Sequence, residues 1–368
     1  MGPFDSAWLA ASVIAMTPLL LAAIGELYSE RAGVLNVGLE GMVLMGAFWG
    51  FWADWYFEDL WIGVFFGMVG GVALAAVMAL LSIQARADQI VVGVGLNLLA
   101  AGVTTFAFRE IFGDRGEIVL PRMDEVAIPL LSDIPVIGEA FFDNTPVVYL
   151  AFLMVPLAWF ALYRTGWGLG IRAVGEMPAA ADTAGVSVAA KRWQGVLIAG
   201  ALAGLAGAYL SVIRLGLFQE GMSAGRGFLA LAAVIFGRWR PAGVLAACAL
   251  FGAADALQLR LQAEEFIPSE VWLVMGLLAA VLTGWVVQRR LQGGPGVARA
   301  LASWGPLIGA VVAIGALALW VREPDVSLPS QLWIALPFVL TLLALAGLAG
   351  QARAPAAITR PYRRDLEA

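Results

Sequence analysis

The chain of 368 residues contains no histidine, one cysteine and one lysine. Without histidine it lacks the commonest general base and the commonest metal ligand, so catalysis by histidine is excluded. The single Cys248 cannot form an intrachain disulfide. Because the single Lys191 follows an alanine, the chain has no G-x-x-x-x-G-K phosphate loop. If the protein uses ATP, another subunit must hydrolyse it.

Charged residues are also scarce, at 13% of the chain against 61% hydrophobic residues. The apolar residues run in blocks of about 17 to 23, the length that crosses a bilayer as a helix. The composition therefore predicts an all-α polytopic membrane protein, with one transmembrane domain over residues 1–368 in the lipid bilayer. The net charge of −5 comes mainly from carboxylates in loops and indicates no role with nucleic acid.

Eleven apolar segments are candidate spans, so we expect 10 or 11 transmembrane segments. The segment 227–237 is too short to cross alone unless residues 217–226 extend it. Otherwise it is a re-entrant half-helix, which a bilayer tolerates only where protein shields it. The candidate spans are 7–24, 37–53, 61–82, 90–108, 147–163, 195–213, 227–237, 241–259, 271–287, 304–321 and 332–349.

Basic residues predict the orientation of these spans. If all eleven cross and the loop 164–194 lies inside, fifteen Lys and Arg are cytoplasmic and seven are outside. The N-terminus is then outside and the C-terminus inside. The loop 109–146, with eight Asp and Glu against three Arg, is extracytoplasmic in this arrangement. Because the N-terminus has no basic region before its first apolar segment, we expect that segment to stay in the protein as a helix.

The sequence of the cytoplasmic loop 164–194 predicts a short helix followed by a bend. Pro178 stands near the start of an alanine-rich stretch and Gly185 at its end, as expected of a short helix. Ser187 then caps the helix that leads into the sixth span. A small-residue helix offered to the cytoplasm suits docking on a partner, and an ordinary solvated connector is the alternative. In the sixth span, glycines form a face suited to close helix packing: Gly200, Gly204 and Gly207.

Polar residues inside the spans are candidates to line a substrate pathway. A charged side chain in hydrocarbon costs roughly 2.5–3.5 kcal/mol, so such residues should face protein, water or a pathway. Asn36 and Glu40 are four apart and share a helix face, Asn97 lies in the fourth span and Asp255 in the eighth. The alternative for each is a hydrogen bond between helices. The sequence thus predicts four pathway candidates: Asn36, Glu40, Asn97 and Asp255.

Glu26, Glu30 and Arg31 stand at the inner end of the first span. An ion pair among them would either hold a gate closed or fix the loop that follows. The second interpretation is the one we favour from the sequence.

Several motifs, taken in order, resemble the permease subunit of binding-protein-dependent ABC importers, in the branch for nucleosides and simple sugars. The resemblance covers about residues 17–270 and resumes at about 328–364. Residues 271–327 depart from it and are predicted to be an insertion of two helices. A local duplication is one explanation, because IPSEVWL (267–273) resembles LPSQLWI (328–334), and chance is the other. The motifs are residues 25–46, DQIVVGVGLN (88–97), GLGIRAVGE (168–176), GRGFLALA (225–232), FGRWRP (236–241) and FGAADALQ (251–258).

The resemblance implies a transport subunit in the plasma membrane that is not itself an enzyme and holds no cofactor. Its implied partners are cytoplasmic ABC ATPases that use the ATP, a second permease, identical or homologous, and an extracytoplasmic binding protein. Residues 172–186 would be the loop that couples to the ATPase. The coupling residues carried over are Arg172, Gly175, Glu176, Pro178, Ala179, Ala180 and Gly185.

The motif GVLNVGLEG (33–41) looks more like nucleoside permeases than ribose permeases, so a nucleoside is the expected substrate. Simple sugars and branched-chain amino acids remain alternatives within the same family. A different class, an ion-coupled secondary transporter, would use Glu40 or Asp255 as a titrating group. An intramembrane enzyme is disfavoured because the chain lacks histidine and any compact pair of nucleophile and base.

Overall fold

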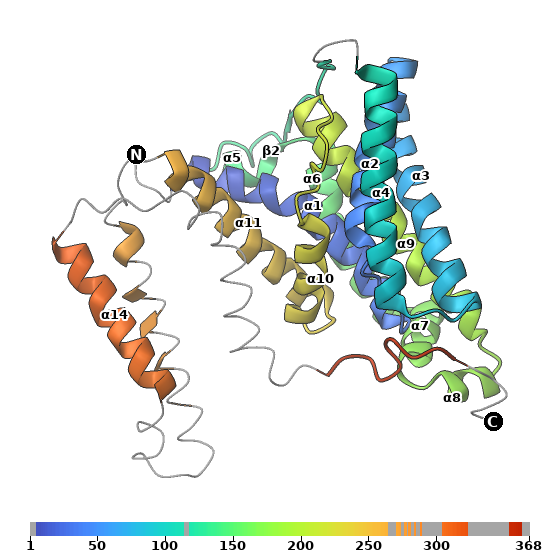
Figure 1. The fold of residues 1–368 in the computed structure, drawn as a ribbon. Coiled ribbons are helices and arrows are strands. Elements are labelled where there is room, and N and C mark those ends of the chain that lie inside the picture. Colours follow the sequence, from blue (N-terminus) through green and yellow to red (C-terminus); the bar gives the residue numbers. More distant parts are fainter. Residues whose placement is uncertain are drawn as a thin grey trace. The chain divides into compact units, whose positions relative to one another are not determined.

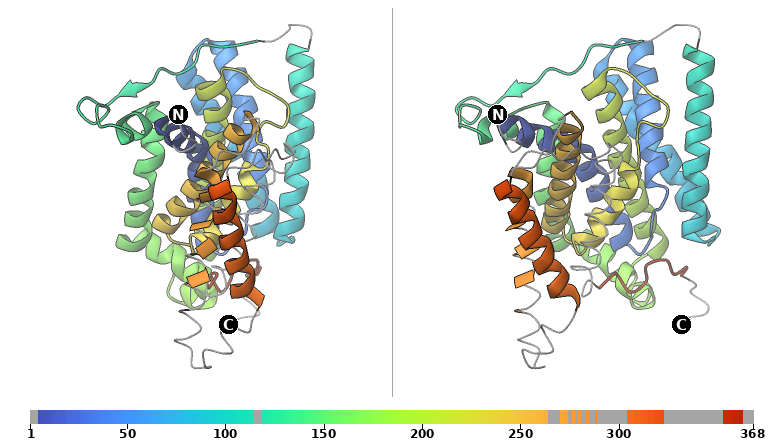
Figure 2. Two further views of the ribbon diagram at one scale, coloured as in Figure 1. Left: turned by 90° about the vertical axis from the view of Figure 1, so that its left-hand side faces the viewer. Right: turned by 60° about the vertical axis from the view of Figure 1, so that its left-hand side comes forward.

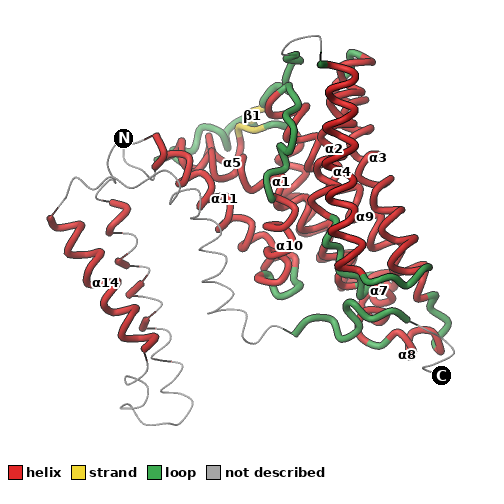
Figure 3. Tube along the Cα trace, viewed as in Figure 1, coloured by secondary structure: helices red, strands yellow, loops and turns green. Residues whose placement is uncertain are grey.

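The computed structural model describes residues 5–113, 118–263, 304–322 and 353–362, with a few residues between 270 and 288 (Figure 1). The described residues form two compact units. The larger unit holds residues 9–255 and 353–362, and the smaller one residues 5–8 and those from 256 to 322. Both are built almost entirely of helices, as Figure 3 shows, so the all-α prediction is confirmed. The candidate span 332–349 and about half of 271–287 lie outside the described residues.

Six helical segments of the described chain are long and apolar enough to cross a membrane. They match candidate spans. The ends agree within two residues for the spans 61–82 and 147–163, and the other four helices extend by four to seven residues beyond the predicted span at one end. The six are α1 (Ser6–Arg31), α3 (Leu60–Ala79) with η1 (Leu80–Gln84), α4 (Gln89–Phe112), α6 (Pro146–Arg164), α9 (Val188–Ala208) with η2 (Tyr209–Leu215), and α11 (Pro241–Ala263). The candidate spans 37–53 and 304–321 correspond to α2 (Leu39–Phe57) and α14 (Trp304–Arg322).

The core of the larger unit is a bundle of α2, α3 and α9, which lie side by side in Figures 1 and 2. These helices approach closely because glycines face one another. A Cβ at Gly46 would overlap the backbone of Gly204, and a Cβ at Gly71 would overlap the carbonyl oxygen of Gly200. At Gly207 the obstacle is the backbone of α2. The predicted small-residue face of the sixth span is therefore a packing face.

The seventh candidate span is a short helix that follows an irregular segment. Residues 216–225 are irregular, and α10 (Arg226–Phe236) has 11 residues, about 16 Å, roughly half the hydrocarbon thickness. The irregular part begins where Gly216 accepts a hydrogen bond of 2.6 Å from the N–H of Leu120, in the loop after α4. Beyond α10, Trp239 contacts Arg31 at the opposite end of the bundle. Together the two parts run from one end of the bundle to the other.

The two ends of the larger unit carry different structures (Figure 1). At one end, β1 (Val126–Ala127) pairs antiparallel with β2 (Asp143–Asn144), next to α5 (Ile137–Phe142). At the other end lie α7 (Gly166–Glu176) and α8 (Pro178–Thr183), within the predicted cytoplasmic loop.

The local signals predicted for that loop are present. Pro178 begins α8, and Gly185 follows it with a φ of +82°. The hydroxyl of Ser187 accepts from the N–H of Ala190 at 3.3 Å and so caps α9. The helix α7 was not predicted, because its four glycines argue against a helix by intrinsic propensity alone.

The smaller unit is held in part by an ion pair between distant parts of the chain. Two nitrogens of Arg260 donate to the two carboxylate oxygens of Asp5 at 2.6 and 2.9 Å. This two-pronged geometry is the strong form of an arginine–carboxylate contact. It fixes the start of the chain to the end of α11 within this unit.

The glycine contacts in the bundle give a test of the packing. We expect Gly204→Val to destabilise the protein by about 1–3 kcal/mol or more, because the added atoms meet backbone of α3 that cannot move aside. The measurement is thermal unfolding of the purified protein in detergent. Gly102→Val in α4 is the matched control, since nothing lies within 4 Å of its Cβ position. Equal melting temperatures for the two variants would contradict the packing role of Gly204.

Candidate functional site

The polar stretch 25–46 forms a buried elbow between α1 and α2. The backbone N–H of Asn36 donates to Oε1 of Glu26 at 2.9 Å, and the N–H of Leu35 donates to Oε1 of Gln89 at 2.8 Å. Glu26 and Asn36 are completely buried. Because an unpaired backbone group in such a place is costly, these side chains stabilise the elbow.

Asn97 of α4 holds the first turn of α2. Its Oδ1 accepts from the N–H of Gly41 at 2.8 Å, and its Nδ2 donates to the carbonyl oxygen of Val37 at 3.0 Å. The first N–H groups of a helix have no partner within the helix, so the amide acts as a cap supplied from a neighbouring element. Both ends of the Asn97 amide are engaged in this arrangement.

Glu40 caps the start of α10. Its Oε1 accepts from the N–H of Gly225 at 2.8 Å, and its Oε2 accepts from the N–H of Gly227 at 2.7 Å. The N-terminus of a helix carries a partial positive charge, which a carboxylate complements. Gly225 has a φ of +82°, and a Cβ at Gly227 would overlap the backbone nitrogen of Glu40. Glycine at both positions therefore allows α2 and α10 to meet here.

The structure thus brings Asn36, Glu40 and Asn97 together around the start of α2. Asp255 lies half-buried on α11. Three of the four predicted pathway residues are therefore together at the start of α2. Among the described residues, Oδ1 of Asn36 has no hydrogen-bond partner.

A second cluster lies at the C-terminal end of α1. Nε and Nη2 of Arg31 donate to the carbonyl oxygen of Trp239 at 3.0 and 2.5 Å, and Nη2 also donates to the hydroxyl of Tyr163 at 3.2 Å. The indole N–H of Trp239 donates to Oε2 of Glu30. Trp239 had no role in the sequence-based predictions, although it stands in the motif 236–241. Its partners are more than 200 positions away, which no local pattern reveals.

The predicted coupling loop packs directly on this cluster. A Cβ at Gly175 would overlap the carbonyl oxygen of Arg31, so the end of α7 touches the end of α1. Nη1 of Arg31 lies 4.0 Å from Oε1 of Glu176. The guanidinium of Arg172 lies over the ring of Tyr163, 4.9 Å from its centroid. The remaining predicted coupling residues are in α8 or directly after it: Pro178, Ala179, Ala180 and Gly185.

An apolar groove opens between α7 and α8. Its volume is about 480 Å³. At its rim Leu169 is 60% exposed and Met177 is 67% exposed. Large apolar side chains exposed at a groove are typical of a protein-binding surface. The lining residues are Gly166, Leu169, Gly170, Ala173, Glu176, Met177, Ala180, Ala181, Ala184 and Val186.

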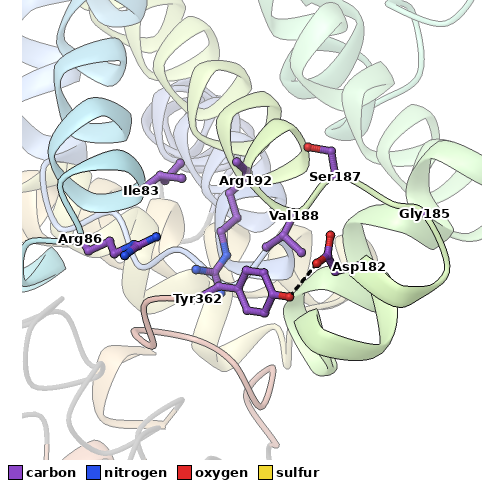
Figure 4. A pocket seen from close by; sticks show the side chains of 9 residues that line it. Ile83, Arg86, Asp182, Gly185, Ser187, Val188, Arg192 and Tyr362 are labelled. Atoms are coloured by element: carbon purple, nitrogen blue, oxygen red, sulfur yellow. Dashed lines mark hydrogen bonds between the residues drawn. The ribbon is translucent and has the colours of Figure 1, made fainter. Parts of the chain in front are cut away.

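Residues 353–362, here called the C-terminal strap, tie the same region together. The N–H of Ala357 donates to the carbonyl oxygen of Gly175 at 2.9 Å, and Nη1 of Arg192 donates to the carbonyl oxygen of Arg360 at 3.0 Å. The hydroxyl of Tyr362 donates to Oδ2 of Asp182 at 3.0 Å. Figure 4 shows this contact at the edge of a cavity of about 500 Å³. The docking of the strap was not predicted.

The contact between α7 and α1 can be tested by adding one methyl group. We expect Gly175→Ala to loosen α7 from the bundle, because the new Cβ would overlap backbone of Arg31 and disturb the bond to Ala357. Limited trypsin digestion should then cleave the loop at Arg172 or Lys191 faster than in the parent protein. Gly166→Ala in the same helix should leave the rate unchanged, since nothing lies within 4 Å of its Cβ position.

Comparison with known proteins places the chain among transport permeases. Over 260 residues it is 47% identical to a putative glucose ABC transporter permease protein of Haloferax volcanii, covering 70% of this chain and 79% of the relative. It is 41% identical to a guanosine ABC transporter permease protein of Bacillus subtilis, with coverages of 68% and 81%. It is 40% identical to a nucleoside ABC transporter permease protein of Lactococcus lactis subsp. cremoris, with coverages of 67% and 80%.

No solved structure gives a significant match. A family model described as the branched-chain amino acid transport system permease component matches residues 9–286. This range contains the buried elbow between α1 and α2, α10 and the coupling loop. It also contains the polar residues around the start of α2 and the cluster around Arg31. The predicted resemblance to ABC permeases is confirmed, and the chain belongs to this family of membrane-embedded permease components.

Proposed function

We propose that this protein is the membrane-spanning permease subunit of an ATP-driven ABC importer that translocates nucleosides. The observation that carries the proposal is the identity of 41% and 40% to permeases named for guanosine and nucleosides. The motif GVLNVGLEG (33–41) favours the same substrate class. In this function the chain binds and gates, and it carries out no covalent chemistry.

The proposed partners follow from the absence of a phosphate loop in the sequence and from the exposed apolar groove. It has no phosphate loop, so a cytoplasmic ATPase supplies the energy and this chain needs no cofactor of its own. The groove between α7 and α8 offers that ATPase an apolar docking surface. A second permease, identical or homologous, completes the pathway in the plasma membrane. An extracytoplasmic binding protein delivers the substrate.

The proposed pathway passes the start of α10. Half-helices that begin inside the membrane present N–H groups to polar substrates in other transporters. Here the start of α10 is next to Glu40, with Asn36 and Asn97 at the adjoining start of α2 and Asp255 on α11. Since Glu40 and Asn97 now bind backbone groups, a substrate would contact them after α10 has moved away from α2.

A simple sugar is the second candidate substrate. The relative that is 47% identical is named as a putative glucose permease. A nucleoside contains a sugar ring, so the same amides and carboxylates could bind hydroxyl groups in either case. A competition experiment separates the two substrates.

We expect deletion of this gene to abolish uptake of labelled guanosine and uridine in cells that express the transport locus and lack a redundant system. Excess ribose and glucose should not compete in the undeleted cells. Nucleoside uptake that is unchanged on deletion would transfer the proposal to sugars. Re-expression of the gene from a plasmid is the control for effects on neighbouring genes.

The role of Glu40 can be tested with Glu40→Gln. The glutamine amide keeps one acceptor and turns an N–H donor toward Gly225 or Gly227, so the cap of α10 is half lost, a cost of about 1–3 kcal/mol. We expect uptake per molecule of permease in the membrane to fall at least severalfold. Glu58→Gln, at the exposed far end of α2, is the control. Unchanged uptake at normal expression would remove Glu40 from the pathway.

A further inference from the structure

The two ends of α10 are attached to two glutamates that stand ten positions apart in the chain. At its start, the carboxylate of Glu40 accepts from two backbone N–H groups, as described above. Just after its end, Trp239 donates its indole N–H to Glu30. Glu30 is completely buried, and Trp239 is 5% exposed. The helix α10 is therefore fixed at both ends to the segment that contains the elbow.

The turn that holds Trp239 is strained. Arg238 and Trp239 have φ values of +55° and +53°, which residues with a side chain rarely adopt. The turn is closed by a hydrogen bond of 3.1 Å from the N–H of Trp239 to the carbonyl oxygen of Val234 in α10. Strained backbone persists only where the surrounding structure imposes it, and it is common at active sites, ligand clamps and switch regions. Here Glu30 and Arg31 impose it.

Arg31 connects this turn to the coupling loop. Its guanidinium donates twice to the carbonyl oxygen of Trp239, and the same residue touches Gly175 and Glu176 at the end of α7. Its side chain is only 16% exposed, so the contacts form in a place with little competing water. A movement of α7 that shifts Arg31 therefore also shifts Trp239.

We propose that Trp239 is a positioning residue that transmits movement of the coupling loop to α10 and thereby gates the pathway. This rests on the proposed function, because it assigns a mechanical role within that same transporter. The order of contacts is α7, then Arg31 with Glu30, then Trp239, then α10, and finally Glu40 at the start of α2. The short helix α10 thus links the coupling loop to the start of α2.

The segment before α10 is built to allow this movement. Gly216, Gly221 and Gly225 all have positive φ values, and residues 216–225 are not helical. Glycine adopts such conformations without steric cost, so the segment can rearrange while α10 stays intact. When the inner end of α10 is displaced, the N–H groups of Gly225 and Gly227 separate from Glu40 and become available to a substrate.

The test removes the indole N–H while keeping an aromatic ring. The transport complex carrying Trp239→Phe is purified with its partner subunits and reconstituted in lipid vesicles, with the binding protein taken from cells together with its natural ligand. We expect ATP hydrolysis without binding protein to continue, while the stimulation by loaded binding protein falls up to about tenfold, the effect of one lost hydrogen bond. Arg31→Lys should give the same result.

Trp61→Phe is the control, because Trp61 is 60% exposed at the start of α3 and lies outside the contacts that run from α7 to α10. Stimulation should be unaffected in this variant. The proposal is overturned if Trp239→Phe leaves stimulation unchanged. It is also overturned if basal hydrolysis, stimulation and melting temperature fall together, because a merely structural role gives that result.

This readout does not depend on which substrate the binding protein carries. If the parent complex fails to import nucleosides but shows stimulation that Trp239→Phe removes, the proposed substrate is wrong and the role of Trp239 stands. If the parent complex imports nucleosides and Trp239→Phe couples normally, the substrate stands and the role of Trp239 fails.

Discussion

The first N–H groups of a helix have no partners within it, and this requirement organises the polar centre of the larger unit. Here the carboxylate of Glu40 accepts from Gly225 and Gly227, and the amide of Asn97 serves the start of α2 in the same way. The buried charge and amide are thereby compensated, because each is bonded to backbone that would otherwise be unsatisfied.

The helices around this centre have less freedom to move than α10. The helices α2, α3 and α9 meet through glycines whose replacement would bring backbone into overlap, so their spacing has little freedom. The helix α10, in contrast, follows an irregular segment, and polar contacts at its two ends add to the packing of its apolar face in the core. Polar contacts can be exchanged for others more readily than close backbone packing. In the proposed mechanism the glycine bundle therefore keeps its shape while α10 moves.

The sequence predicted most of the helices because long apolar runs in a chain so poor in charge have few other structures available. It also predicted the short helix and the bend of the coupling loop, because Pro178, Gly185 and Ser187 act through local backbone geometry. It did not predict the link of Trp239 to Glu30 or the docking of the C-terminal strap. Those contacts join positions 168 to 209 apart, and no periodicity in the chain reports them.

The same geometry bears on whether Glu40 carries charge across the membrane. Both oxygens of Glu40 accept from backbone N–H groups at the start of α10, so the carboxylate already serves as a cap for that helix. A residue that fixes an element through both oxygens is suited to holding a gate, and this favours a gate driven from the coupling end over one driven by an ion.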